Sequence, residues 1–243
     1  MKKYLLSIIR SLPIVVIGLC GCSSSDEDNW GYVPDIPIEL LNQTTTEFTG
    51  DEWYWANVGK SEREYKENGE LKMERDCQGA ITYIWFGDTP AEERPKTVAE
   101  FYEKFYGKGV ADYFKCTQHI EWMTDVHEYY QQYYKGIKVM TEARCIGFRD
   151  GLMLFASCDY LPVKDFNVVP KFSKLVAIEI FKSFMKLDAY DEISCELQIA
   201  RVPVGDSFGP RLAYEVKRRS QGLLIDANSG RVLYKTYYDY MFL

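Results

Sequence analysis

The segment HEYYQQYYKGIKV, from His127 to Val139, constrains the fold most strongly, because it predicts two strands joined by a tight turn. Lys135-Gly136 forms the turn, where glycine readily adopts the positive φ that two-residue hairpins require. A second turn is expected at Arg149-Asp150-Gly151. The segment and its continuation predict an antiparallel meander with strands over Glu128 to Tyr134, Lys138 to Phe148 and Leu152 to Tyr160.

Two segments have the apolar spacing of amphipathic helices. The first, TVAEFYEKFYG, has apolar residues at i, i+3, i+4, i+7 and i+8 and ends at Gly107. These residues are Val98, Phe101, Tyr102, Phe105 and Tyr106. The second, SKLVAIEIFKSFMKL, begins at Ser173, which is expected to cap the helix. Its apolar face contains Ala177, Ile180, Phe181 and Phe184.

Strand patterns precede the first of these helices and follow the second. The earlier group has an alternating strand from Trp53 to Val58, a hairpin that turns at Asn68-Gly69, and a strand from Ala80 to Phe86. The later strands are expected over Glu196 to Val202, Arg211 to Arg218, Gly222 to Asp226 and Arg231 to Tyr237. This order predicts an α+β fold with two consecutive modules, each a helix plus an antiparallel sheet, after a β-rich N-terminal segment over 50–90.

The first residues, MKKYLLSIIRSLPIVVIGLCGC, have the pattern of an export signal, with a short basic start and an apolar stretch from Leu12 to Leu19. A membrane-spanning helix would need roughly 20 apolar residues. The run Leu19-Cys20-Gly21-Cys22 resembles the lipobox of bacterial lipoproteins. We therefore expect a signal peptide over residues 1–21 and a membrane anchor through lipid on Cys22.

The residues after Cys22, SSSDEDNW, combine a serine run with three acidic residues. They resemble the acidic signal with which some Gram-negative bacteria send lipoproteins to the outer face of the outer membrane, although a solvated linker has the same composition. Residues 22–49 show little periodicity and are expected to form a tether. The expected location is therefore the outer membrane, with the protein lipid-anchored and exposed at the cell surface.

Net charge argues against nucleic acid as a partner. The chain carries 29 basic and 36 acidic residues, a formal charge of −7. Removal of Lys2, Lys3 and Arg10 with the leader leaves 26 basic residues and a charge of −10. Binding to phosphate groups requires a basic surface, which this composition does not favour.

Cysteine spacing gives no indication of a metal site or another cofactor. Apart from Cys20 and Cys22, the chain has five cysteines: Cys77, Cys116, Cys145, Cys158 and Cys195. An odd count leaves at least one thiol free or paired between chains. Cys145 and Cys158 flank a predicted turn and could face each other across two strands, whereas no C-x-x-C pair that would suggest structural zinc is present.

Two successions of motifs resemble known protease leader modules. HEYYQQYYKGIKV, Arg149-Asp150-Gly151 and Leu161-Pro162 are similar to the FTP module of fungalysin and thermolysin propeptides. SKLVAIEIFKSFM, PRLAYEVKRR and LLIDANSGRVLYK are similar to the PepSY module that follows FTP in those propeptides. The resemblance implies an FTP-like module over 91–170 and a PepSY-like module over 171–243.

In that family the propeptide precedes a zinc protease with the motif H-E-x-x-H, in which two histidines hold the metal. This chain has only His119 and His127, and His127-Glu128 is followed by Tyr129, Tyr130 and Gln131. The second metal ligand is therefore missing. The resemblance then implies a prodomain-like protein with no enzyme attached, and we predict no catalytic and no metal-binding residues.

The two faces of the strand expected over Glu128 to Tyr134 suggest different roles. Tyr129, Gln131 and Tyr133 on one face are expected to fix the sheet, and His127 is expected to be a structural strand residue. The other face, with Tyr130, Gln132 and Tyr134, is predicted to contact a partner, because tyrosine combines large area with a polar tip. Near the C-terminus Tyr240, Phe242 and Leu243 either lie in a partner's cleft as a product-like plug or pack as the end of the last strand.

Three other groups of residues have a structural and a functional interpretation. Cys116 and His119 could form a nucleophile and base, but a buried or disulfide-bonded cysteine fits better without an orienting motif. Trp53-Tyr54-Trp55 could stack on a sugar ring, or could be an alternating half-buried strand. Acidic residues that alternate with basic ones indicate a solvated face rather than a calcium site, and they are Glu62, Glu64, Glu67 and Glu70.

These observations predict a non-enzymatic surface lipoprotein that resembles a protease prodomain and binds a secreted or surface protease or another protein, inhibiting it or assisting its folding. The alternative is an accessory surface lipoprotein that binds a glycan or a peptide. A concave pocket lined by Trp53, Trp55 or Trp85 favours the alternative. A flat or convex aromatic face favours protein binding.

Overall fold

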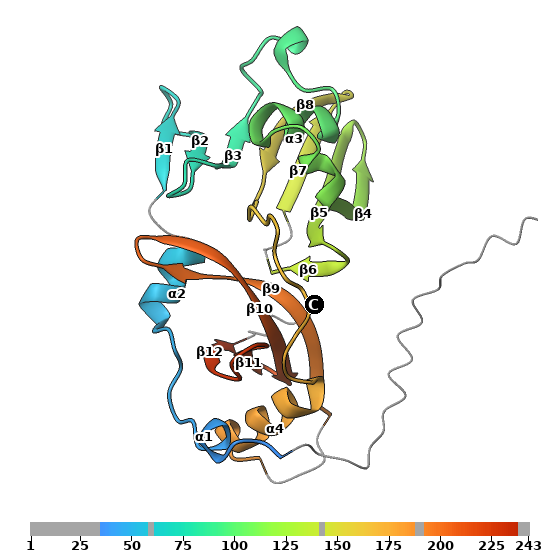
Figure 1. Cartoon of the computed structure of the whole chain (residues 1–243). Helices are drawn as coiled ribbons and strands as arrows, with labels where there is room; N and C mark the ends of the chain where they lie inside the picture. The colour runs from blue at the N-terminus through green and yellow to red at the C-terminus, as the bar shows by residue number, and fades with distance from the viewer. Residues whose placement is uncertain (1–34, 58–60, 141–143, 188–191, 238–243) are drawn as a thin grey trace, which may run out of the picture. The chain divides into compact units, whose positions relative to one another are not determined.

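The computed structural model describes residues 35–57, 61–140, 144–187 and 192–237, which belong to one compact unit. Its helices are α1 (Ile38–Leu41), α2 (Gly50–Asn57), α3 (Val98–Tyr106) and α4 (Lys174–Met185), with two 3-10 turns, η1 (Ala91–Glu93) and η2 (Val110–Tyr113). The strands before α4 are β1 (Glu62–Tyr65), β2 (Leu71–Arg75), β3 (Ile81–Trp85), β4 (Phe114–Trp122), β5 (Asp125–Tyr134), β6 (Ile137–Val139), β7 (Arg144–Arg149) and β8 (Leu152–Ser157). Those after α4 are β9 (Ser194–Val204), β10 (Ser207–Arg218), β11 (Gln221–Asp226) and β12 (Val232–Tyr237) (Figure 1).

The twelve strands are connected in one hydrogen-bonded order, β1-β2-β3-β8-β7-β5-β6-β9-β10-β11-β12, with β4 paired to β5. Strands take 43% of the described residues and helices 20%, so the fold is mostly β. Our prediction of an α+β fold with two helix-plus-sheet modules is therefore wrong. The helices are short, and β6 pairs with both β5 and β9, which connects the strands on either side of α4.

The segment from Trp53 to Val58, predicted as a strand, is instead the helix α2 as far as Asn57. Thr49 and Glu52 explain the difference, because they form a capping box. The Glu52 N–H donates to the Thr49 hydroxyl at 3.2 Å, and the Thr49 N–H donates to the Glu52 carboxylate at 2.8 Å. This local signal outweighs the alternation of aromatic residues.

Two other strand predictions also need correction. The expected strand from Lys138 to Phe148 is divided into β6, which ends at Val139, and β7, which begins at Arg144. The strand β4 was not predicted at all, because FKCTQHIEW mixes polar and apolar residues without a clear alternation. The hairpin at Asn68-Gly69 is confirmed, with Gly69 at φ 85° between β1 and β2.

One face of the strands β3, β8 and β7 is covered by α3, as Figure 1 shows. Phe101 and Tyr102 of α3 are almost completely buried against Ile146, Met153 and Ala156. The helix begins where predicted, since the Thr97 hydroxyl accepts from the Glu100 N–H, and it ends at Gly107. The predicted apolar face is thus confirmed.

The strands β9 to β12 are covered on both faces. On one face α4 packs through Val176, Ala177, Ile180 and Phe181, and the Ser173 hydroxyl caps this helix as predicted. On the other face Trp53 of α2 packs against Ala200, Val202, Ala213, Leu224 and Leu233. This part of the sheet is therefore enclosed between two helices, which explains its continuous apolar sequence.

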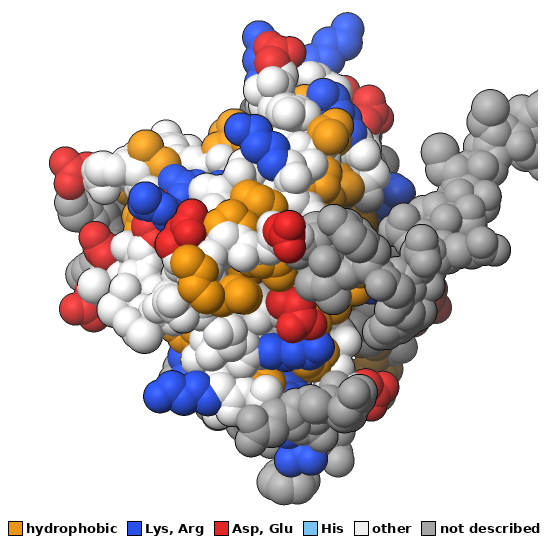
Figure 2. Space-filling view, turned by 60° about the horizontal axis from the view of Figure 1, so that its bottom comes forward, with side chains coloured by type: hydrophobic (Ala, Val, Ile, Leu, Met, Phe, Trp, Pro, Cys, Tyr) orange, Lys and Arg blue, Asp and Glu red, His pale blue; other side chains and the backbone are white. Residues whose placement is uncertain are grey.

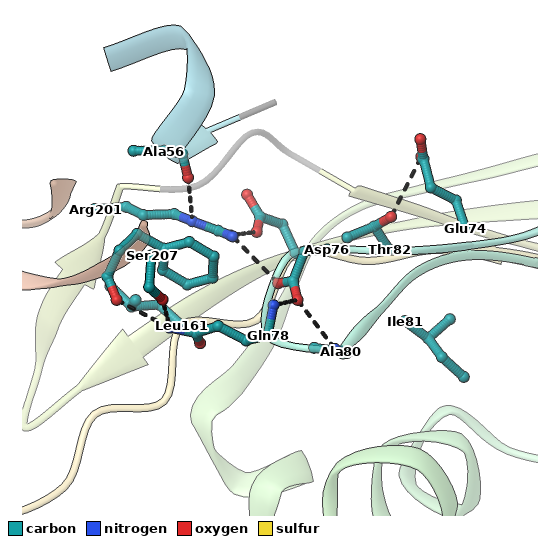
Figure 3. Close-up of polar contacts among 12 residues, drawn as sticks. Ala56, Glu74, Asp76, Gln78, Ala80, Ile81, Thr82, Leu161, Arg201 and Ser207 are labelled. Carbon is teal, nitrogen blue, oxygen red and sulfur yellow. Dashed lines mark hydrogen bonds and ion pairs between the residues drawn. The ribbon is translucent and has the colours of Figure 1, made fainter. Parts of the chain in front are cut away.

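A buried arginine, Arg201 of β9, connects three segments that are far apart in the sequence (Figure 3). Its guanidinium donates to the carbonyl oxygen of Ala56 at 2.9 Å and to the carboxylate of Asp76 at 3.2 Å. It also bonds Asp159, just after β8, and its Cζ lies 3.2 Å from the ring centre of Phe208. The side chain of Arg201 is 3% exposed, and those of Asp159 and Asp76 are 8% and 11% exposed.

Replacing Arg201 by alanine is expected to lower the free energy of unfolding by about 3–5 kcal/mol, because two largely buried carboxylates lose their partner. Urea unfolding of the purified chain measures this loss. Arg63→Ala is the matched control, since Arg63 also pairs with a carboxylate, at 2.6 Å from Glu74, but its side chain is 49% exposed. Equal losses in the two variants would contradict a central role for Arg201.

Candidate functional site

The face of β5 that was predicted to contact a partner is the face that packs toward the interior. Gln132 and Tyr134 are 1% and 8% exposed, and Tyr130 packs partly buried under α3. The Gln132 side-chain amide donates to the Leu161 carbonyl oxygen at 2.8 Å and accepts from the Leu161 N–H at 3.0 Å. The face that we expected to contact a partner therefore faces the interior, and this expectation of exposure is wrong.

Gln131 is buried as well, although it points to the opposite side of β5 from Gln132. Its amide donates to the carbonyl oxygen of Val139 at 2.7 Å. Both amides thus hold backbone groups of neighbouring segments, which satisfies buried polar groups on both sides of the strand.

Other predicted site residues lie outside the described part of the chain. These are the lipidation site Cys22 and the C-terminal residues Tyr240, Phe242 and Leu243. Their roles stay predictions.

The opposite face of β3, β8, β7, β5 and β4 carries a group of aromatic and apolar side chains. Directly paired residues share a face of a sheet, and the observed pairs include Trp85 with Phe155 and Ile120 with His127. We call this surface the aromatic face and define it by Tyr83, Trp85, Ile120, Trp122, His127, Tyr129 and Phe155. Trp122 is 75% exposed and Ile120 41% exposed, whereas the others are partly buried.

The rings of the aromatic face support one another. Tyr83 stacks on Phe155 with ring centres 6.5 Å apart, and His127 meets Phe155 edge to face at 5.8 Å. Lys66 lies 4.4 Å from the ring centre of Trp85. α3 packs on the other side of these strands, so the aromatic face lies on a sheet that is backed by a buried core.

Gly147 makes room for this arrangement, since the Phe155 ring lies directly over it. A Cβ at position 147 would come within 2.2 Å of a ring carbon of Phe155. Gly147 does not have a positive φ. Glycine is therefore required here because the Phe155 ring lies close to the backbone, and not because of the backbone conformation.

Beside β5 lies β4, with a cluster of ionisable groups on the face toward α3. The His119 ring nitrogens lie 2.9 Å from a Glu121 carboxylate oxygen and 3.0 Å from one of Glu128. Hydrogen bonds to Glu121 and Glu128 raise the pKa of His119 above its ordinary value. The Tyr130 hydroxyl donates to the other Glu128 oxygen at 2.8 Å.

This cluster does not include the proposed cysteine nucleophile. The Cys116 thiol is directed at the carbonyl oxygen of Gln118 at 3.4 Å, and His119 is engaged by carboxylates. Neither interpretation of Cys116 holds, because the thiol is not bonded to His119 and it is exposed and free rather than buried or disulfide-bonded.

All five described cysteines are free thiols in the structure. Cys145 lies opposite Tyr129 on the side of the aromatic face, whereas Cys158 is buried in the core under α3. Burial raises the pKa of the Cys158 thiol to about 12, so it is a neutral thiol at physiological pH. The suggestion that Cys145 and Cys158 face each other is therefore wrong.

The possible sugar platform is also not formed by the described residues. Trp53 is 9% exposed and stacks on Tyr234, with ring centres 4.5 Å apart and planes inclined by 5°. A cavity of about 470 Å³ lies nearby, but its lining includes Phe48, Glu52, Pro203 and Asp206 and not Trp53. The four acidic residues Glu62, Glu64, Glu67 and Glu70 are exposed, in agreement with a solvated face.

Among the described residues, none of the helices has both the length and the apolar composition that spanning a bilayer requires. No group of three or more His, Cys, Asp or Glu residues in this part of the chain is arranged to hold a metal ion. Figure 2 shows one face, on which acidic and basic side chains are interspersed with groups of hydrophobic ones.

No protein-family model matches the chain, and no curated protein matches it. Among solved structures the chain is similar to the Bacillus megaterium YpeB C-terminal domain, with 12% sequence identity and a TM-score of 0.34. The match covers 74% of this chain and 89% of that domain.

Gly147→Ala is expected to lower the free energy of unfolding by about 1–3 kcal/mol, because the added methyl group displaces the Phe155 ring. Urea unfolding measures the effect. In a chain that already carries Phe155→Ala the same substitution should cost much less, since the ring is gone. Equal costs in both backgrounds would show that Gly147 does not make room for Phe155.

Proposed function

We propose that this protein is a non-enzymatic surface lipoprotein that binds another secreted or surface protein through its aromatic face. A protease is the first candidate partner, because the sequence resembles FTP and PepSY modules of protease propeptides. Binding would inhibit the partner or assist its folding. The location at the outer membrane rests on the leader and on lipidation of Cys22.

The observation that carries the proposal is the exposure of apolar side chains on a sheet surface opposite a helix-covered core. Trp122 and Ile120 remain accessible at one end of the aromatic face. Burying such a side chain fully contributes roughly 1.5–3 kcal/mol. Tryptophan and tyrosine are also enriched where proteins bind one another.

The aromatic face also requires little reorganisation to bind. Tyr83, Phe155 and His127 already contact each other, and Gly147 fits under the Phe155 ring. An interface that is ordered before binding loses less conformational entropy on association. A sheet surface of this kind suits a protein partner better than a small molecule, which usually binds in a concave pocket.

The alternative, a glycan- or peptide-binding lipoprotein, has less support. Of the tryptophans expected to line a pocket, Trp53 stacks on Tyr234 and Lys66 lies over Trp85. The side chain of Trp55 lies outside the described residues.

Site-specific cross-linking tests the proposed surface. A photoreactive phenylalanine analogue is placed at Trp122, and in a matched control at Tyr65 of β1, which is 58% exposed but is separated from β4 by five strands of the sheet. We expect a cross-linked partner from position 122 alone. With that partner purified, Trp122→Ala should weaken binding at least about tenfold, as for interface hot spots, and Tyr65→Ala should not. Unchanged affinity in Trp122→Ala would contradict the proposal.

The role of the C-terminal residues has a separate test. If they lie in a partner's cleft, deletion of Met241 to Leu243 should leave the thermal unfolding midpoint unchanged and abolish inhibition of a captured protease. Inhibition is measured with a peptide substrate at saturating concentrations of this protein. Retained inhibition would remove the tail from the mechanism and leave the aromatic face as the sole binding element.

A further inference from the structure

Three strands of the described sheet have a side that no other described strand pairs with, and they differ in protection. β1 is four residues long and carries Glu62, Arg63 and Glu64, which keep an edge from pairing. Beside β12 the Glu47 and Phe48 N–H groups donate to the carbonyl oxygens of Val232 and Leu233. The outer edge of β4 is longer, and no described segment donates backbone hydrogen bonds to it as Glu47 and Phe48 do beside β12.

The strand β4 has the features of an edge that accepts another strand. It is nine residues long, contains no proline, and eight of its residues are exposed. Ile120 and Trp122 are exposed, and Met123, next to the strand, is 93% exposed. A long edge with accessible apolar side chains is a template for pairing with a further chain.

A bulge between Cys116 and Gln118 interrupts the pairing of β4 with β5, and a regular segment follows it. From Gln118 to Trp122 each residue lies opposite its partner on β5 without a further shift. This five-residue segment can therefore extend the sheet outward.

The segment is complementary to itself when two copies run antiparallel. With Ile120 at the centre, Ile120 lies opposite Ile120 of the other copy, and His119 lies opposite Glu121. Gln118 then lies opposite Trp122. An imidazolium thus meets a carboxylate twice and the two Ile120 side chains meet at the axis, so the charges are complementary and the central contact is apolar.

We propose that a second copy of this chain pairs with β4, antiparallel and about a two-fold axis at Ile120. Such an interface is isologous, because the same segment of each copy contacts the other. The proposal goes beyond the proposed function and stands independently of it. Since Ile120 and Trp122 belong to the aromatic face, pairing also joins the aromatic faces of the two copies into one surface.

The charges around His119 make this pairing depend on pH. In each copy His119 faces Glu121 of β4 and Glu128 of β5, while Tyr130 donates to Glu128, and Lys96 lines a cavity together with Glu128 and Tyr130. When both imidazoles are protonated, they lie among four carboxylates. When they lose their protons, the four carboxylates lack this compensation, so association weakens as the pH rises through the raised pKa of His119.

Sedimentation velocity of the mature chain tests the pairing. The chain begins at residue 22 with Cys22→Ser, which retains the compact unit over 33–243, and it is kept reduced because Cys77 and Cys116 are exposed. We expect a dimer within roughly 1–200 µM at about pH 5.5, and at least about tenfold weaker association at about pH 8.5, on either side of the ordinary histidine pKa of about 6.5.

Substitutions separate this interface from other modes of association. Ile120→Lys places two charges at the axis and should give a monomer, whereas Tyr65→Lys on β1 should not. His119→Lys keeps a cation at high pH and should preserve the dimer at about pH 8.5. A monomer at all concentrations, or a dimer indifferent to both Ile120→Lys and pH, would overturn the proposal.

A disulfide test fixes the register. In a background with Cys77→Ser and Cys116→Ser, Ile120→Cys should form a cross-linked dimer on mild oxidation, because paired residues at the axis lie about 4.5–5.5 Å apart between Cα atoms. Trp122→Cys should not, since position 122 faces Gln118. The opposite result would exclude the register about Ile120. Cross-links from position 122 to a second copy are distinguished by mass from those to a different protein.

Discussion

The buried guanidinium of Arg201 is the interaction on which the arrangement of the chain depends. It brings a carbonyl of α2, the turn between β2 and β3 and the segment after β8 to one point on β9. The cost of burying a charge is offset only when its hydrogen bonds are satisfied, and here Asp76 and Asp159 provide opposite charge while Phe208 covers the guanidinium plane. Asp76 also accepts two N–H bonds, from Gln78 and Ala80, within its own turn. The site therefore fixes both the turn and its position against β9.

A second constraint acts on β5, where two adjacent glutamines are buried on opposite faces. Gln132 bonds both backbone groups of Leu161, and Gln131 bonds the carbonyl of Val139 at the end of β6. These contacts hold the segments that follow β6 and β8 against the strand. Because residues alternate along a strand, burying Gln132 and Tyr134 sends His127 and Tyr129 to the other side. The aromatic face is thus a consequence of how β5 is anchored.

Local sequence signals were sufficient to predict the helices with strong apolar periodicity and the turns that contain glycine. The helices α3 and α4 have clear apolar spacing and side-chain caps at Thr97 and Ser173, and the turns at Lys135-Gly136 and Asn68-Gly69 contain glycine at positive φ. The capping box at Thr49 and Glu52 also predicts a helix from the sequence, but the alternating aromatic residues after it favoured a strand. The sequence could not predict which face of β5 is buried. Alternation assigns the residues to two faces, but only tertiary packing decides which face is covered. The predicted division into two modules failed for the same reason. The strand that connects the two parts of the sheet, β6, has only three residues, and its pairing with β9 depends on tertiary packing.

The distribution of helices explains why exposed apolar surface is found where it is. The strands β9 to β12 lie between α2 and α4, whereas β3, β8, β7 and β5 have α3 on one side only. A sheet that is covered on one face needs either polar residues on the other face or a partner that covers it. Here the face that no described helix covers carries Trp122, Tyr129 and Phe155, and the outer edge of β4 adjoins it. Retaining such groups has a cost in solubility, and a binding role for this side of the molecule is the simplest physical reason to retain them.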